Sequence, residues 1–335
     1  MRSRRVGAAL AIAAGTAQVL HMRRIAADPR RRELEHPARG RPVALRSADG
    51  TELHAEVFGE PDGSPTVVLV HGWTESLLLW TYVIKELVPR GVRVVALDLR
   101  GHGQSSPAES DDYTVERFGE DVEAVLEACI PAGERAVLAG HSLGAMAIVA
   151  WAEHHDVEQR IAAAALLNTG VSNLVSEHLI VPVPGFAKPI SRVISARVLG
   201  APGPIPRFST PIGYFLTRYA AFGPDASPAQ VAFYERMLAS CSWRVRADSG
   251  IALSTTELEH ALPRLTVPTL VMASELDKVT PPAHARRIAA ALPQLHKLVV
   301  LPRTGHMGPI ERPHEVSEEL AELLGVARGP SAVAA

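Results

Sequence analysis

The chain has 335 residues, of which 47% are hydrophobic and 21% are charged, a composition that is typical of a folded globular protein and excludes general disorder. Lys and Arg number 34 and Asp and Glu 36, so the formal net charge of -2 lacks the basic excess expected of a nucleic-acid-binding protein. Two cysteines cannot staple a chain of this length, so the fold must depend on a hydrophobic core.

The chain begins with a basic leader, residues 1–41. Up to residue 46 there are eleven arginines against three acidic residues, whereas the remainder of the chain is acidic. Residues 6–22 carry no charge, and these 17 positions lie at the lower limit of about 17 for a membrane-spanning helix. Alanine and several polar residues make the stretch only weakly apolar.

Three interpretations of the leader remain open. It could be a signal peptide, although the sequence AAGTAQ offers no clear A-x-A cleavage step, which disfavours secretion. It could be a weak membrane anchor, whose flanking arginines suit anionic lipid, so that residues 1–46 contact a membrane. It could also be a helix that lies on the catalytic domain of a cytoplasmic protein, or a frayed end of the chain.

The chain beyond the leader alternates between strand-like and helix-like segments. Two short strands flank a turn at Asp49-Gly50, and six further runs are typical of strands buried on both faces of a parallel sheet. These runs are 66–70, 92–97, 135–140, 161–167, 268–273 and 297–301. Helical patterns at 80–88, 115–129, 145–154, 283–292 and 314–324 separate them. The alternation predicts an α/β fold with a mostly parallel, eight-stranded sheet and helices on both faces.

A long interruption divides this pattern at about 170–262. It is rich in Pro and Gly at first and becomes helical over 228–238. A gap this long exceeds an ordinary connection, so we predict an inserted helical lid within one catalytic domain, residues 42–325. The Ala-rich end, 326–335, is expected to be a flexible tail.

The pentapeptide Gly-His-Ser-Leu-Gly, residues 140–144, lies between a predicted strand and a predicted helix. In that context Gly-x-Ser-x-Gly is the nucleophile elbow, a sharp turn that lifts the serine clear of the sheet. The glycines leave room for the neighbouring strand and helix. The following helix aims its free N–H groups at the reaction centre.

Taken with four further motifs, this turn resembles the α/β-hydrolase fold family from about Pro42 to Leu324. The motifs are VLVHGW, LDLRGHGQS, VMASELDKVTPP and LPRTGHMGPIERP. The resemblance implies a serine-nucleophile, lid-bearing enzyme of the esterase or lipase-like branch. It also implies a triad of Ser142, Asp277 and His306, which occur in the family's order and follow predicted strands.

The chemistry of acyl transfer assigns a role to each residue. His306 would deprotonate Ser142 as general base, and Asp277 would orient the imidazole and stabilise its charged form. The backbone N–H groups of Trp73 and Leu143 are the candidates for the oxyanion hole. Glu275 is the rival for the acid, and the Thr-Pro-Pro continuation favours Asp277.

The other polar residues are expected to be structural. His71, Gly72, His102 and His141 are assigned to the walls and turns of the site, and Asp98 to capping its own loop. Five histidines are expected to be solvated, in or beside surface helices: His154, His155, His284, His296 and His314. Cys129 and Cys241 have no surrounding motif and are expected to be buried and inert. No ligand spacing indicates a metal, and no Gly-rich loop indicates a phosphate-containing cofactor.

The identity of the nucleophile narrows the function. Epoxide hydrolases and haloalkane dehalogenases of this fold use Asp at the elbow, whereas Ser142 suits cleavage of carboxylic-ester-type bonds. Thioesterase, carbon–carbon hydrolase and perhydrolase or haloperoxidase chemistry could use the same triad, and a non-catalytic, ligand-binding protein is the alternative of another class. We expect a small or medium apolar acyl substrate, because aromatic residues of the lid could line a pocket for it. The same residues could instead pack the lid on the core. They are Phe186, Phe208, Tyr214, Phe215, Tyr219, Phe222, Phe233 and Tyr234.

Overall fold

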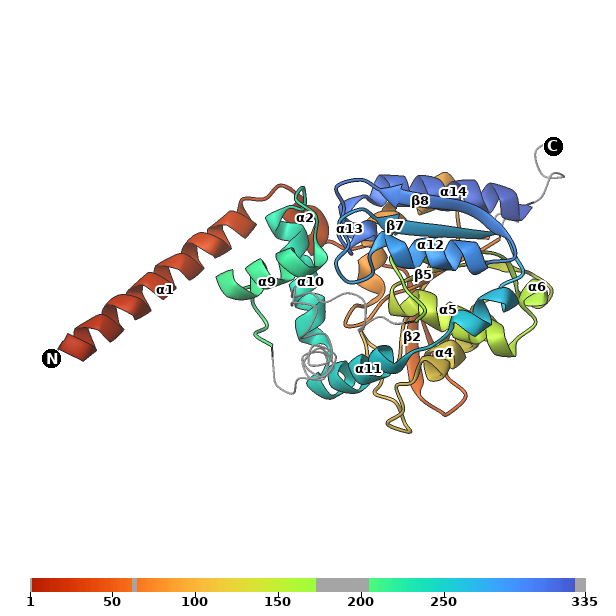
Figure 1. The fold of residues 1–335 in the computed structure, drawn as a ribbon, viewed down its shortest axis with the longest axis horizontal. Helices are drawn as coiled ribbons and strands as arrows, with labels where there is room; N and C mark the ends of the chain where they lie inside the picture. Colours follow the sequence, from red (N-terminus) through yellow and green to blue (C-terminus); the bar gives the residue numbers. More distant parts are fainter. Residues whose placement is uncertain (1, 62–64, 173–204, 329–335) are drawn as a thin grey trace.

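An eight-stranded sheet forms the centre of the molecule (Figure 1). The computed structural model describes residues 2–61, 65–172 and 205–328. The strand order is β1-β2-β4-β3-β5-β6-β7-β8. The strands are β1 (Arg41–Arg46), β2 (Glu52–Phe58), β3 (Val67–Val70), β4 (Val94–Asp98), β5 (Ala136–His141), β6 (Ile161–Leu167), β7 (Thr269–Ser274) and β8 (Leu295–Leu301). The predicted eight-stranded α/β-hydrolase sheet is therefore confirmed.

The direction of the strands determines where the loops meet. β2 runs antiparallel to both β1 and β4, and every pairing from β4 through β3 to β8 is parallel. The central strands β3 to β7 are buried along their whole length, which explains their uninterrupted apolar sequences. Because parallel strands end on the same edge, the segments that follow β3 to β8 gather there.

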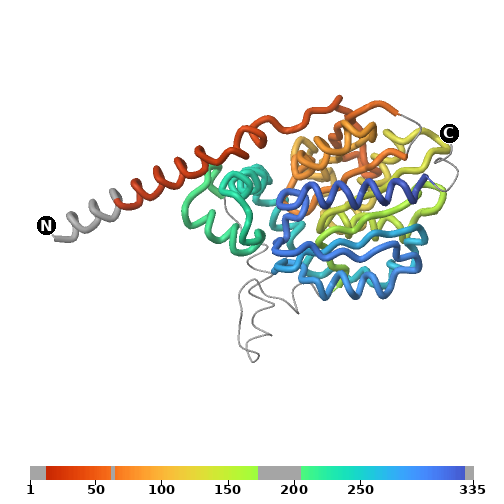
Figure 2. Tube along the Cα trace, turned by 90° about the horizontal axis from the view of Figure 1, so that it is seen from above, coloured from red at the N-terminus to blue at the C-terminus, as the bar shows by residue number. Residues whose placement is uncertain are grey.

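Helices cover both faces of the sheet (Figure 2). One hydrophobic core contains side chains of α4 (Val115–Cys129), α5 (Leu143–His154) and α12 (Pro282–Ala291). The other contains side chains of α3 (Thr81–Leu87) and α14 (Pro313–Arg328). The shorter elements are η1 (Leu77–Trp80), η2 (Val88–Arg90), α6 (Val157–Arg160), η4 (Glu259–Arg264) and α13 (Gly308–Glu311).

A cap of three described helices is inserted between β6 and β7: α9 (Pro211–Ala221), α10 (Pro228–Ser240) and α11 (Trp243–Thr255). The sequence predicted α10 alone. Its start is marked by a capping box in which Ser227 and Gln230 each accept the other's backbone N–H. The sequences of α9 and α11 lack a clear apolar stripe, so their pattern did not predict a helix. Residues 173–204 of the predicted insertion lie outside the described residues.

The leader forms α1 (Arg2–Ala26) and α2 (Arg30–Glu35), and α1 packs against the cap helices α9 and α10. The side-chain amide of Gln18 donates to the carbonyl of Ser209 at 2.8 Å, and the His21 ring hydrogen-bonds the Ser209 hydroxyl at 2.8 Å. The Arg24 guanidinium lies 5.9 Å above the ring of Tyr214. None of the helices in the described part of the chain is long and apolar enough to cross a membrane.

Candidate active site

Ser142 occupies a strained turn between β5 and α5. Its backbone adopts φ 51° and ψ −117°, a conformation that residues with a Cβ rarely hold. Its N–H donates to the carbonyl of Leu167 at the end of β6, at 2.9 Å, and its carbonyl accepts from the Thr169 hydroxyl at 2.9 Å. Two neighbouring segments thus hold the turn in place.

Three glycines provide the space that this turn needs. A Cβ added to Gly144 would lie 2.3 Å from the carbonyl oxygen of Val70, and one added to Gly140 would lie 2.5 Å from the backbone nitrogen of Ala145. A Cβ at Gly72 would lie 3.0 Å from the Cβ of Ser142. Backbone atoms cannot move aside as a flexible side chain can, so Gly140 and Gly144 require glycine, whereas the atoms nearest to a Cβ at Gly72 all belong to side chains.

Replacing Gly144 with Ala is expected to lower the free energy of unfolding by about 1–3 kcal/mol or more, because the added methyl group overlaps the end of β3. Urea denaturation measures the change. The matched control is Gly325→Ala in α14, where a Cβ would meet nothing within 4 Å. That variant should be stabilised by up to about 1 kcal/mol through helix propensity. Equal stability of the Gly144 variant and the wild type would contradict the packing described.

His306 and Asp277 form a buried pair. The Nδ1 atom of His306 lies 2.8 Å from Oδ2 of Asp277, and both side chains are almost completely buried. Since Asp277 follows β7 and His306 follows β8, the same edge of the sheet that carries Ser142 carries this pair. The pair fixes the proton of a neutral imidazole on Nδ1 and leaves Nε2 as the basic nitrogen.

The carboxylate of Asp277 is held ionised by several donors. Its Oδ1 accepts the backbone N–H groups of Val279 and Thr280 at 2.8 and 2.9 Å, and its Oδ2 accepts the Thr280 hydroxyl at 2.9 Å. Burial alone would raise the pKa of Asp277, but the charge of His306 and these hydrogen bonds hold it below its usual value.

Asn168 also supports Asp277, although no motif in the sequence pointed to it. Its amide donates to Asp277 at 3.1 Å and to the Ser274 hydroxyl at 2.8 Å. Asn168 follows β6 with φ 46°, so a polar residue directly after a buried strand was the available signal. Glu275, the rival acid, is exposed and accepts the backbone N–H of Arg303 at 2.8 Å. Asp277 is thus the acid that contacts His306.

A second buried carboxylate–histidine pair lies beside the first. Oε2 of Glu75 lies 3.1 Å from Nδ1 of His141, and Nε2 of His141 donates to the backbone carbonyl of His306 at 2.9 Å. Glu75 also accepts the N–H of Gly72 at 2.5 Å. This pair joins the turn after β3, the residue before Ser142 and the loop of His306. Glu75 was not among the predicted site residues.

The two charges of this pair stabilise each other. Burial alone would lower the pKa of His141, but the Glu75 carboxylate raises it above the usual value of about 6.5. Burial would raise the pKa of Glu75, but His141 lowers it. The contribution of His141 to the free energy of unfolding is therefore fully present below the usual pKa of histidine. It is lost as the pH rises through the raised pKa of His141 in the folded protein.

Replacing Glu75 with Gln is expected to remove this pH dependence, because burial then keeps the His141 imidazole neutral throughout. Between about pH 6 and pH 8 the wild type should lose stability, by at most ~1.4 kcal/mol per pH unit, and the variant should lose less. Urea denaturation across that range measures both. As a control, Glu86→Gln removes a pair with the exposed His314 and should leave the curve unchanged. Identical slopes for Glu75→Gln and the wild type would count against the pair.

The loop of His306 is also fastened to the cap. The backbone N–H groups of His306 and Met307 donate to the carbonyl of Ala221, the last residue of α9, at 2.8 and 3.3 Å. The carboxylate of Glu311 accepts the N–H of Gly305 at 2.9 Å and that of Gly223 at 2.8 Å. Burial raises the pKa of Glu311 to about 7. A shift of the cap would therefore move the backbone of His306.

The two candidate oxyanion donors belong to two segments that adjoin Ser142. Leu143 is the first residue of α5, where backbone N–H groups have no partner within the helix. Trp73 follows Gly72, which packs against Ser142. The indole of Trp73 donates to the carbonyl of Arg246 at 3.1 Å and the hydroxyl of Ser249 at 3.0 Å, so it ties this turn to α11. Trp80 is fully buried in the core.

The loop after β4 is structural, as predicted for Asp98. That carboxylate accepts the N–H groups of Leu77 and Gln104 at 2.7 and 2.9 Å. His71 is buried: Nδ1 donates to the carbonyl of Gly72 at 2.7 Å and Nε2 accepts from Leu99 at 3.0 Å. Burial lowers the pKa of His71, so its imidazole is neutral and shapes the turn.

Two of the predicted surface histidines are placed differently in the structure. His296 lies within strand β8 rather than in or beside a helix, and its side chain is 22% exposed. His284 lies on the inner face of α12 and is only 1% exposed, because the helix presents that position to the sheet. The two cysteines are buried, as expected, and burial raises the pKa of both thiols. Within the described ranges, no three His, Cys, Asp or Glu side chains are grouped as metal ligands.

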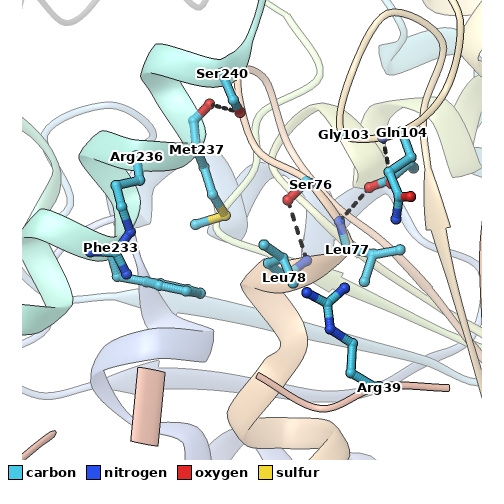
Figure 3. A pocket seen from close by; sticks show the side chains of 11 residues that line it. Arg39, Ser76, Leu77, Leu78, Gly103, Gln104, Phe233, Arg236, Met237 and Ser240 are labelled. Carbon is cyan, nitrogen blue, oxygen red and sulfur yellow. Dashed lines mark hydrogen bonds between the residues drawn. The ribbon is translucent and has the colours of Figure 1, made fainter. Parts of the chain in front are cut away.

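A pocket of about 400 Å³ lies between the cap and the core, and Ser142, Asp277 and His306 are not among the residues that line it (Figure 3). Met237 and Phe233 enter it from α10, facing Leu78, and Arg39 enters from the opposite side. The predicted aromatic lining of the lid is found only in part. Phe233, Phe222 and Tyr214 are buried, whereas three others are exposed: Phe208, Phe215 and Tyr219. Phe186 lies outside the described residues.

The chain belongs to the alpha/beta hydrolase family, whose signature it matches over residues 67–319. The AB hydrolase superfamily protein YisY of Bacillus subtilis is 28% identical over 277 residues, 82% of this chain and 97% of that protein. The probable oxidoreductase EphD of Mycobacterium tuberculosis is 26% identical over 84% of this chain, which spans about half (49%) of EphD. A crystal structure of a hydrolase from Pseudomonas aeruginosa aligns with a TM-score of 0.67 at 26% identity, covering 85% of this chain and 99% of that one.

Proposed function

We propose that the protein is a serine hydrolase that cleaves carboxylic-ester-type bonds through an acyl-enzyme intermediate. One observation carries the proposal: Ser142 lies on the same edge of the sheet as the buried His306–Asp277 pair. Its backbone is strained, and the glycines around it leave room for the turn. Membership of the alpha/beta hydrolase family supports the general class of reaction.

His306 begins the reaction by taking the proton of the Ser142 hydroxyl on Nε2 as the oxygen attacks the ester carbonyl carbon. Asp277, ionised by its surrounding donors, stabilises the imidazolium that forms. His306 then returns the proton to the leaving alkoxide. An acyl-serine ester remains, and water attacks it with His306 again as general base.

The negative charge on the tetrahedral intermediate requires backbone donors. The N–H groups of Trp73 and Leu143 are assigned to it, because they flank Ser142 from two different segments and the positive end of the α5 dipole points the same way. Loss of one such donor typically lowers kcat about a hundredfold or more.

An apolar acyl group is the favoured substrate feature. The cap contributes buried Phe222, Phe233 and Tyr214 to the apolar core beside the sheet. Thioester, diketone and perhydrolase-type chemistry would use the same Ser142, so relative kcat/KM values for the corresponding substrates separate these alternatives from ester hydrolysis. A non-catalytic protein would turn over none of them.

Substituting Ser142 with Ala is expected to reduce kcat/KM for p-nitrophenyl esters by at least about a thousandfold, because no other group supplies the nucleophile. Initial-rate assays over a series of acyl chain lengths measure the loss. Ser110→Ala, at an exposed loop serine, is the control and should retain wild-type rates. Full turnover by the Ser142 variant would refute the mechanism, and inactivity of the wild type on every ester would refute the substrate class.

A further inference from the structure

Exposed apolar side chains gather on one side of the molecule. Of the fourteen large hydrophobic residues that are exposed in the described ranges, eight belong to just two segments, 19–22 and 208–219. Scattered apolar residues are normal on a protein surface, but a concentration of this kind marks an interaction site.

Helix α9 carries most of this surface. Its buried residues, Tyr214 and Ala221, face the molecule, and the opposite side bears residues spaced three or four apart. We call that side, with the residue before the helix, the apolar cap face: Phe208, Ile212, Phe215, Leu216 and Tyr219, between 43% and 75% exposed. A helix that is apolar on both sides is expected to be surrounded by apolar material, in a core or in a membrane.

Helix α1 extends the same surface. Val19, Leu20 and Met22 are 42–59% exposed, whereas Gln18 and His21 hydrogen-bond Ser209. Figures 1 and 2 both show the C-terminal part of α1 beside the cap, on the side away from the sheet, with the rest of the helix projecting outward. The end of the uncharged stretch, at Gln18 and His21, therefore lies next to the segment that leads into α9.

The charges around this surface are mainly positive. Helix α9 contains no acidic residue, and exposed arginines follow the apolar part of α1 at Arg23 and Arg24. Arg207 is exposed just before Phe208. At the other end, Nζ of Lys278 lies 3.5 Å from the centre of the Tyr219 ring and donates to the Tyr219 carbonyl. Aromatic residues with basic neighbours are characteristic of the lipid headgroup region.

We infer that the apolar cap face, together with the exposed side of α1, docks on the surface of a bilayer that contains anionic lipid. The apolar side chains enter the boundary between headgroups and acyl chains, and the arginines attract the negative headgroups. A helix lying in this interface does not have to span the bilayer.

Such docking would bring the lipid surface close to the loops that carry Asp277 and His306. Lys278, which contacts Tyr219, directly follows Asp277 in the chain. The carbonyl of Ala221, at the end of α9, accepts the N–H of His306. The docking surface is thus continuous with the backbone of two proposed triad residues. The inference itself concerns binding and does not depend on the proposed chemistry.

Sedimentation of the full chain with lipid vesicles tests the proposal. The wild type should bind vesicles of phosphatidylcholine mixed with phosphatidylglycerol, should bind pure phosphatidylcholine more weakly, and should be released by salt. The double variant Phe215→Gln and Leu216→Gln should bind mixed vesicles at least about tenfold more weakly, because it loses two inserted side chains. Arg23→Gln with Arg24→Gln should reduce binding to mixed vesicles only.

The matched control replaces two exposed apolar residues of the edge strand β8, Leu295→Gln with Val300→Gln, and should bind as the wild type does. Ser142→Ala should also bind normally, which separates docking from catalysis. Wild-type affinity in the Phe215/Leu216 variant would overturn the proposal. Size-exclusion chromatography without vesicles provides a second test. If the wild type elutes as a dimer and the Phe215/Leu216 variant as a monomer, the proposal is also overturned, since the apolar cap face would then join two copies of the chain.

Discussion

The backbone conformation of Ser142 is the constraint around which the rest of the site is arranged. A φ of 51° with ψ of −117° places the serine at the top of a sharp turn, and it is tolerated only because neighbouring segments hold it. Gly144 lets α5 approach the end of β3, and Gly72 lets the following loop reach Ser142 itself. Asp277 and His306 lie on the same edge as Ser142 because all three residues follow parallel strands, whose carboxyl ends share one edge of the sheet.

Two buried carboxylate–histidine pairs meet at this edge with different tasks. Asp277 holds the His306 ring and fixes its tautomer. Glu75 raises the pKa of His141, and His141 in turn hydrogen-bonds the backbone carbonyl of His306. A buried ion pair gives little net stability when compared with apolar residues, but it specifies one arrangement of the loops that it joins. We attribute the position of His306 to both pairs together.

The sequence was most informative where one local rule applied. Continuous β-branched runs located the buried strands, and Gly-x-Ser-x-Gly between a strand and a helix located the turn at Ser142. Contacts between distant segments left no such pattern. Glu75 meets His141 across 66 positions, and Asn168 meets Asp277 across 109. His284 was misplaced because a single polar residue does not reveal which side of a helix faces the sheet. α9 was missed for a related reason, since it is apolar on both sides.

The central claim is that the hydroxyl of Ser142 is the activated nucleophile. Reaction with a fluorophosphonate followed by peptide mass mapping tests it directly, because the reagent phosphonylates only a serine that a neighbouring base activates. The account predicts one adduct per chain, on the peptide that contains Ser142, and a strongly reduced rate of labelling in Asp277→Asn, where the imidazole would be held in the wrong tautomer. An adduct on another residue, or no adduct on the folded wild-type protein, would contradict it.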